Sequence, residues 1–271
     1  MYESYWQLET KPFEDTSDAR FYYPSEVHQG ALLKLRYAIE NRRGAALLTG
    51  ATGLGKTLLV QALAAQLPSE FSPLVHLVFP DMPSDQLLAY LAGSLTGEAT
   101  ATMPSVQQSV RRLERALEEN AEMGGHAVVV IDEAHLLRDT TLETVRLLLN
   151  FHKDLAPSMT LLLVGQPSLL PTLDRMLDLN GRMSVKCLLR PFTTEETMGY
   201  VSHRVSAAGA DKPIFDSKAL EAIHYYSQGV CRTINRICDL ALLIGFAEEQ
   251  SEIKAEQIEA VSEELITVTP E

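Results

Sequence analysis

The sequence is poor in cysteine and has no long apolar run. Its three cysteines, Cys187, Cys231 and Cys238, are too few and too irregularly spaced for a disulfide framework or a metal site, so we expect free thiols in a reducing compartment. The longest purely apolar stretches, such as residues 240–244, are far shorter than the roughly 18 residues that a membrane-spanning helix needs. The N-terminus lacks the basic stretch followed by an apolar one that marks a secretory signal. We therefore expect a cytoplasmic protein without membrane insertion of its own.

Basic residues are also scarce. The chain has 23 Lys and Arg against 36 Asp and Glu, a net charge of −13. Residues 248–271 hold eight Glu and one Lys, so −7 of the total lies in this acidic end. Such a balance does not favour binding of nucleic acid over the whole surface, although it leaves room for a local basic patch inside an oligomer. Nucleic acid is therefore a less favoured partner.

Short apolar runs alternate with helical patterns over the first two thirds of the chain. We expect strands at residues 45–49, 74–79, 127–131, 160–164 and 185–189. The helices between them are expected at residues 56–67, 84–95, 105–123, 139–154 and 168–177. Continuous apolar strands that alternate with helices indicate an α/β fold with a parallel sheet covered on both faces.

Strand patterns stop after Pro191, and helices are expected near residues 194–208, 216–227, 230–249 and 254–266. At the other end, residues 1–24 hold seven aromatic side chains, which suggests a segment strapped onto a core. A helix is expected from Ser25 to about Arg42. The sequence therefore predicts an N-terminal segment and helix packed on the nucleotide site (1–42), an α/β core (43–190) and a small all-helical domain with an acidic end (191–271).

Residues 50–57 read GATGLGKT and match the phosphate-binding pattern G-x-x-x-x-G-K-[ST]. The pattern follows an expected strand and opens an expected helix, as it must to cradle phosphates on backbone N–H groups at a helix N-terminus. Lys56 would reach the β- and γ-phosphates of ATP, and the Thr57 hydroxyl would bind Mg²⁺. The alternative is a glycine turn without a ligand. The expected nucleotide-binding residues are Gly50, Ala51, Thr52, Gly53, Leu54, Gly55, Lys56, Thr57 and Leu58.

Two acids end the expected strand at 127–131. Asp132 would hold Mg²⁺ through water, and Glu133 would act as general base on the attacking water. Two acids after a strand are weak evidence alone, but they support the phosphate-binding pattern about 75 residues upstream. His135 completes the sequence DEAH, and for it we favour a solvated or locally bonded side chain.

Three further polar residues are candidates for the same site. Gln166 follows the expected strand at 160–164 and could orient the attacking water, or it could be a turn residue before Pro167. Arg182 precedes the fifth strand, and Arg232 begins an expected helix of the C-terminal domain. A guanidinium near the γ-phosphate stabilises negative charge in the transition state, although surface arginines are common.

Together these residues resemble the AAA+ ATPases of the ExeA/GspA type, from the general secretion pathway of Gram-negative bacteria. The resemblance covers nearly the whole chain and includes Tyr5-Trp6-Gln7-Leu8, Lys11-Pro12-Phe13, Phe21-Tyr22-Tyr23-Pro24-Ser25, the P-loop, Asp132-Glu133-Ala134-His135, Gly165-Gln166-Pro167, Arg182-Met183, Glu195-Glu196-Thr197, His203-Arg204-Val205 and Gly229-Val230-Cys231-Arg232. Departures are Ala51, Leu58 and Cys231, where the family usually has Glu, Thr and Pro. None of these removes a catalytic group.

The resemblance implies a P-loop AAA+ core whose parallel five-stranded sheet has the order 5-1-4-3-2, followed by a small all-helical lid. It also implies that Arg182 is an arginine finger acting on a neighbouring subunit of a ring or hexamer-like homo-oligomer, and that Arg232 is a sensor arginine. Secretion-type members continue into a membrane helix and a periplasmic domain, whereas this sequence stops at Glu271. We therefore expect an inner-membrane protein partner, through which the chain would be peripheral at that membrane.

The leading hypothesis is an oligomeric AAA+ ATPase, with ATP and Mg²⁺ as cofactors, that energises assembly of a bacterial envelope apparatus for secretion, pilus formation or polysaccharide export. The alternative is a DNA-associated AAA+ regulator that resembles the TniB/TnsC transposition ATPases. A nucleotide-gated switch with negligible turnover is a third class, against which the presence of both Asp132 and Glu133 argues.

Overall fold

The computed structural model describes residues 1–14, 18–98, 102–153 and 156–267. The chain divides into two compact units, which we treat separately. The sheet unit comprises His28–Ala51 and Ala62–Leu189, and the helical unit comprises Met1–Val27, Thr52–Gln61 and Arg190–Glu271. Among the described residues, none of the helices combines the length and the apolar character needed to cross a lipid bilayer.

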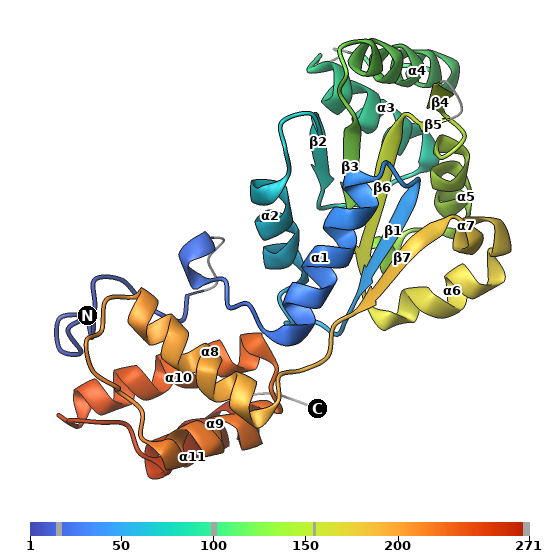
Figure 1. Ribbon diagram of the computed structural model, residues 1–271. Coiled ribbons are helices and arrows are strands. Elements are labelled where there is room, and N and C mark those ends of the chain that lie inside the picture. The colour runs from blue at the N-terminus through green and yellow to red at the C-terminus, as the bar shows by residue number, and fades with distance from the viewer. Residues whose placement is uncertain (15–17, 99–101, 154–155, 268–271) are drawn as a thin grey trace. The chain divides into compact units, whose positions relative to one another are not determined.

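The sheet unit is built on five parallel strands (Figure 1). These are β1 (Ala45–Thr49), β2 (Leu74–Leu77), β3 (Ala127–Ile131), β6 (Met159–Gly165) and β7 (Met183–Leu188), in the order β2-β3-β6-β1-β7. Counted along the chain, this is the expected order 5-1-4-3-2, which is confirmed. The three central strands are buried along their whole length, and their sequences are continuous apolar runs for that reason.

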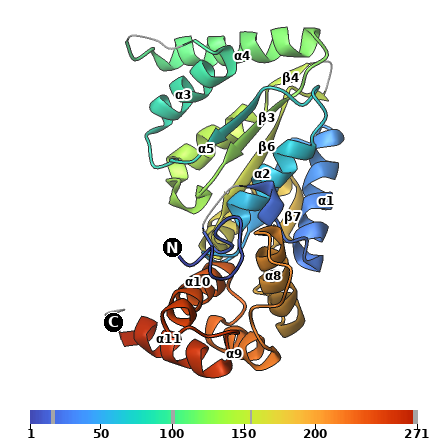
Figure 2. The ribbon, with the colours of Figure 1, turned by 90° about the vertical axis from the view of Figure 1, so that its left-hand side faces the viewer.

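Helices cover both faces of this sheet (Figure 2). On one face lie α3 (Ser84–Thr96), α4 (Val106–Glu122) and α5 (Asp139–Leu148), whose leucines share a hydrophobic core with alternate residues of β3 and β6. On the other side lies α1 (Glu26–Glu40), where the Ala31 carbonyl oxygen is 3.9 Å from the Cys187 sulfur of β7. The α/β architecture predicted from the alternating pattern is therefore confirmed.

Two helix predictions were wrong in this unit. The helix expected at residues 139–154 ends at Leu148, and the antiparallel pair β4 (His152–Lys153) and β5 (Ala156–Pro157) follows it. Ser158 extends this pairing by donating its N–H to the Phe151 carbonyl at 3.0 Å, so hydrogen bonds between these two segments take the place of a further helical turn. The helix expected at 168–177 is broken into η3 (Pro167–Leu169), α6 (Leu170–Arg175) and α7 (Leu177–Gly181), because Met176 has a non-helical backbone (ψ 69°).

The helical unit contains η1 (Ala19–Phe21), α8 (Thr194–Ala207), α9 (Ser217–Ser227), α10 (Cys231–Ala247) and α11 (Ala255–Thr267). The helix α2 (Lys56–Gln66) begins in this unit and ends in the sheet unit. N-terminal aromatic residues, among them Tyr2, Trp6 and Phe13, are buried in one core with α8 and α10. The Trp6 Nε1–H donates to the Leu242 carbonyl at 2.9 Å. The prediction that the N-terminal aromatics form a segment strapped onto a core is confirmed.

Arg204 of α8 fastens this N-terminal segment although the residue is only 2% exposed. Its guanidinium donates hydrogen bonds to the carbonyls of Pro12 and Glu14, the latter at 2.7 Å, and lies over the Phe21 ring at 4.6 Å from its centroid. Burial of an arginine is tolerated here because carbonyl acceptors and an aromatic face replace part of its hydration.

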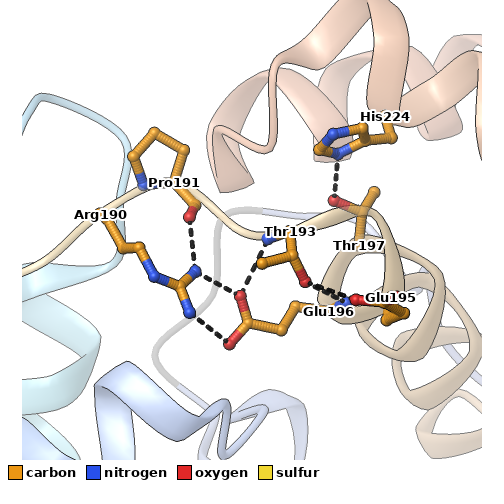
Figure 3. A network of polar contacts seen from close by, with 7 residues as sticks. All are labelled: Arg190, Pro191, Thr193, Glu195, Glu196, Thr197 and His224. Carbon is orange, nitrogen blue, oxygen red and sulfur yellow. Dashed lines mark hydrogen bonds and ion pairs between the residues drawn. The ribbon is translucent and has the colours of Figure 1, made fainter.

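The start of α8 is fixed by a polar network (Figure 3). Thr193 and Glu196 form a capping box, in which each side chain accepts a hydrogen bond from the other residue's backbone N–H, at 3.2 and 2.9 Å. Arg190 donates to the same Glu196 carboxylate at 2.6 Å, and the Thr197 hydroxyl contacts His224 Nδ1 at 2.9 Å. The network therefore sets where α8 begins, immediately after the chain leaves the sheet.

Candidate nucleotide site

Most of the P-loop, residues 52–58, belongs to the helical unit. Gly53 and Gly55 both have a φ of +81°, which only glycine adopts without strain, and Lys56 opens α2. Successive N–H groups in such a turn form a concave anion-binding surface at a helix N-terminus. Lys56 is 6% exposed, and the Leu59 N–H already donates to the Gly55 carbonyl at 2.9 Å. The loop thus has the backbone that phosphate binding requires.

The first turn of α10 lies against this loop. The Arg232 N–H donates to the Gly53 carbonyl oxygen at 3.1 Å. A Cβ atom on Gly53 would come within 2.9 Å of the Arg232 Cβ and 3.1 Å of the Val230 Cγ1. The Arg232 side chain itself is exposed. The structure therefore brings Arg232 to the P-loop through backbone contact. Its role as a sensor stays a prediction.

In the sheet unit, other predicted residues gather at the carboxyl ends of adjacent strands. The Gly50 N–H donates to the Gly165 carbonyl at 3.2 Å, which joins the first P-loop residue to the end of β6. Gly165 in turn leaves room for the turn after β3, because a Cβ there would be 3.1 Å from the His135 nitrogen. Gln166 follows Gly165 with an extended backbone and is the N-cap residue of η3. The prediction that this strand lies between the P-loop strand and the acidic strand is confirmed by the strand order.

Asp132 and Glu133 differ sharply in their surroundings. Asp132 is 2% exposed, and its Oδ1 accepts the Glu133 N–H at 2.9 Å. The Glu133 side chain is 41% exposed, and its backbone is left-handed (φ 50°, ψ 34°), a conformation that costs a non-glycine residue about 1 kcal/mol or more. The buried, fixed carboxylate of Asp132 is suited to bind a hydrated metal ion. The more accessible carboxylate of Glu133 is suited to accept a proton from water.

Sequence reasoning missed His76, whose Nε2 lies 3.4 Å from Asp132 Oδ2. The signal was a polar residue inside the apolar strand β2. The ligands expected for Mg²⁺ are the Thr57 hydroxyl and the Asp132 carboxylate. Both are oxygen ligands, the kind that this ion prefers. In the described part of the chain, no group of three or more His, Cys, Asp or Glu side chains forms a separate metal cluster.

Arg182 is not brought to this edge of the sheet. It caps the end of α7 immediately before Met183, the first residue of β7, and β7 runs parallel to β1 with Met183 opposite Ala45. Arg182 therefore lies at the amino ends of the strands, whereas Gly50 follows their carboxyl ends. A five-residue strand separates the two edges by roughly 16 Å. The Arg182 side chain donates to Asn150 Oδ1 at 2.7 Å, a partner that the sequence pattern did not indicate.

The cysteines add no reactive group. Burial raises the pKa of the Cys231 thiol to about 12, and burial also raises the pKa of the Cys187 and Cys238 thiols. All three are free, as predicted. Cys231 stands beside Arg232, so the raised pKa keeps a neutral thiol rather than a thiolate next to the P-loop contact.

The comparisons with known proteins agree with this architecture. Residues 39–173 match the family model described as AAA domain. Over 257 residues, 93% of this chain, the sequence is 34% identical to general secretion pathway protein A of Aeromonas hydrophila. The chain spans 46% of the length of that relative.

Two solved structures show the same fold at low sequence identity. Cdc6p of Pyrobaculum aerophilum has a TM-score of 0.73 at 19% identity, over 96% of this chain and 74% of that one. The RuvB Holliday junction branch migration motor of Thermotoga maritima has a TM-score of 0.62 at 20% identity, over 89% of this chain and 70% of that one. The chain therefore carries a P-loop AAA domain on an AAA+ fold and is a homologue of general secretion pathway protein A.

Proposed function

We propose that this chain binds ATP·Mg²⁺ at its P-loop and hydrolyses the ATP to ADP and phosphate. The observation that carries the proposal is the P-loop backbone, with two glycines at a φ of +81° leading into a buried Lys56 at the N-terminus of α2. The N–H groups of residues 50–58 would cradle the phosphates, and Lys56 would contact the β- and γ-phosphates.

Thr57 and Asp132 would hold the magnesium ion, Thr57 by its hydroxyl and Asp132 through bound water. Bound Mg²⁺ would neutralise charge on the phosphates. The hydrogen bond from the Glu133 N–H to Asp132 Oδ1 supports this role, because it fixes the carboxylate at the strand end.

Glu133 would take a proton from the attacking water as the water oxygen bonds to the γ-phosphorus and the bond to the bridging oxygen breaks, which releases ADP. Gln166, from the adjacent strand end, would orient the same water. The order of β3, β6 and β1 supports this pairing, since their carboxyl ends are neighbours.

We propose further that Arg182 serves the nucleotide of a neighbouring copy in a ring or hexamer-like homo-oligomer. Its place at the amino ends of the strands argues against a role at the Glu133 of its own chain. Arg232, whose backbone touches Gly53, would respond to the nucleotide of its own chain. In this proposal residues 1–42, 43–190 and 191–271 act as an N-terminal segment on the nucleotide site, a catalytic core and a lid.

The similarity to general secretion pathway protein A supports a role in energising assembly of a bacterial envelope apparatus, for secretion, pilus formation or polysaccharide export. The chain would then work in the cytoplasm, peripheral at the inner membrane through a protein partner. The alternative of a DNA-associated regulator predicts ATP turnover that is stimulated by DNA and falls steeply with salt. An ATP hydrolysis rate that does not change when DNA is added would favour the envelope role.

Equilibrium binding of a fluorescent ATP analogue tests the nucleotide site. Lys56→Ala should abolish binding, because the phosphates lose the P-loop cation, while Lys186→Ala on β7 should bind as the wild type does. Omission of Mg²⁺ should weaken binding in the wild type. Unchanged affinity in Lys56→Ala would place the phosphate site elsewhere.

A further inference from the structure

A short helical turn places a histidine ring beside the candidate base. The turn η2 (Ala134–Leu136) follows Glu133 directly, and the Leu136 N–H donates to the Glu133 carbonyl at 2.9 Å. His135 Nδ1 lies 3.4 Å from Glu133 Oε2. The two side chains are therefore held together by their own backbone, two residues apart.

The ring nitrogen that faces this carboxylate is buried. His135 Nδ1 is shielded from solvent and, among the described residues, has no hydrogen-bond partner. The His135 side chain is 12% exposed and that of Glu133 is 41% exposed. The carboxylate is thus the freer of the two groups, and a small rotation would turn the 3.4 Å contact into a hydrogen bond. Buried polar groups without a hydrogen-bond partner are uncommon, so this nitrogen needs an explanation.

The backbone that carries the ring is held rigidly. Ala134 is fully buried in the core of the sheet unit. Gly165 packs so closely on the turn that a Cβ would stand 3.1 Å from the His135 nitrogen and 3.5 Å from the Ala134 nitrogen. The backbone that carries the ring is therefore fixed against β6.

We propose that His135 is a positioning residue for Glu133. The neutral imidazole carries its proton on Nδ1 and donates it to the carboxylate, which holds Glu133 in one orientation toward the attacking water. This inference rests on the proposed function, in which Glu133 is the general base. Of the two readings that the sequence suggested for the histidine of DEAH, a solvated or a locally bonded side chain, it takes the second and adds a positioning role.

Three substitutions separate this role from simple packing. In His135→Asn the amide nitrogen lies as many bonds from Cα as Nδ1 does, so the donor is kept. His135→Gln moves the amide to the distance of Nε2, and His135→Leu removes the donor while it keeps an apolar side chain. The Gln and Leu variants should lose roughly tenfold in kcat, with KM and the Kd for ATP within about twofold of the wild type, as expected for one lost hydrogen bond. His135→Asn should keep kcat within about threefold. Equal loss in all three variants, or the best activity in His135→Leu, would contradict the proposal.

A second measurement needs no catalysis. Nitrogen–proton correlation spectra of the histidine rings, recorded without nucleotide, report which nitrogen is protonated, and the His135 signals are those missing in His135→Asn. We expect the Nδ1–H form in the wild type and the Nε2–H form in Glu133→Ala. The Nε2–H form in the wild type would overturn the inference. If the wild type proves inactive, the proposed function fails, and this spectrum still decides whether His135 holds Glu133.

Discussion

Arg182 donates a 2.7 Å hydrogen bond to Asn150, and this pair lies at the edge of the sheet where the strands begin. The remaining candidate residues of the sheet unit follow the ends of β1, β3 and β6. One chain thus presents the candidate site residues at one edge of the sheet and, roughly one strand length away, the guanidinium of Arg182. A closed assembly of copies could bring the guanidinium of one copy to the candidate site of the next.

We expect Arg182→Ala to bind ATP almost normally and to hydrolyse it poorly. In GTPases an arginine supplied in trans raises kcat by a factor of about 10³–10⁵. Wild-type turnover should rise with protein concentration. Arg175→Ala, in α6, is the matched control and should keep turnover.

Mixing two inactive variants tests the trans arrangement. Arg182→Ala keeps Glu133, and Glu133→Gln keeps Arg182, so some interfaces of a mixed assembly combine an intact site with an intact arginine. Phosphate release should return on mixing. No recovery in assemblies that demonstrably contain both variants would mean that Arg182 acts within its own chain or only holds the fold.

Gly53→Ala should disturb the contact between the P-loop and α10. The residue has a φ of +81°, and the new methyl group would meet the Arg232 Cβ at 2.9 Å. We expect the free energy of unfolding to fall by about 1–3 kcal/mol and ATP affinity to weaken. Gly30→Ala in α1, where a Cβ meets nothing within 4 Å, should be neutral or slightly stabilising. Equal melting temperatures for wild type and Gly53→Ala would refute the packing described here.

His126 should make the stability of the protein depend on pH. Its pKa is lowered from 6.5 to about 4, chiefly by burial and to a lesser degree by the positive charge of Arg42. The Thr160 hydroxyl donates to the Arg43 carbonyl at 2.7 Å, so it accepts a hydrogen bond from His126 Nε2–H at 2.9 Å. Burial disfavours a second proton on this ring.

Because the unfolded chain binds this proton more readily, the contribution of His126 is complete above pH 6.5 and is lost as the pH falls toward 4. The loss is at most about 3 kcal/mol. His126→Gln keeps a donor near the Nε2 position and cannot titrate, so its unfolding free energy should depend less on pH between 6.5 and 4. Parallel curves for wild type and variant in denaturant titrations would contradict this assignment.

Much of this protein could be predicted from its sequence, for identifiable reasons. Continuous apolar runs between helical patterns indicated the five strands, and the P-loop pattern needed only residues that are close in sequence. The strand order came from the family resemblance, because periodicity does not specify which parallel strands are neighbours.

Other features depend on contacts that no pattern encodes. The end of α5 at Leu148 goes with the pairing of β4 and β5, and the burial of Arg204 goes with its hydrogen bonds to carbonyls near residue 12. The contact of His135 with Glu133 requires a left-handed glutamate, a conformation that residue type does not indicate. Asn150 became identifiable only as the partner of Arg182.

Single-turnover and steady-state ATP hydrolysis by the wild type and Glu133→Gln test the central claim most directly. We predict that both bind ATP·Mg²⁺ with similar affinity, that the wild type releases ADP and phosphate, and that Glu133→Gln is slower by about 10²–10⁴, since the amide cannot accept the proton of the attacking water. Equal turnover in the two proteins, or no turnover in a wild type that binds ATP under assembling conditions, would contradict the account.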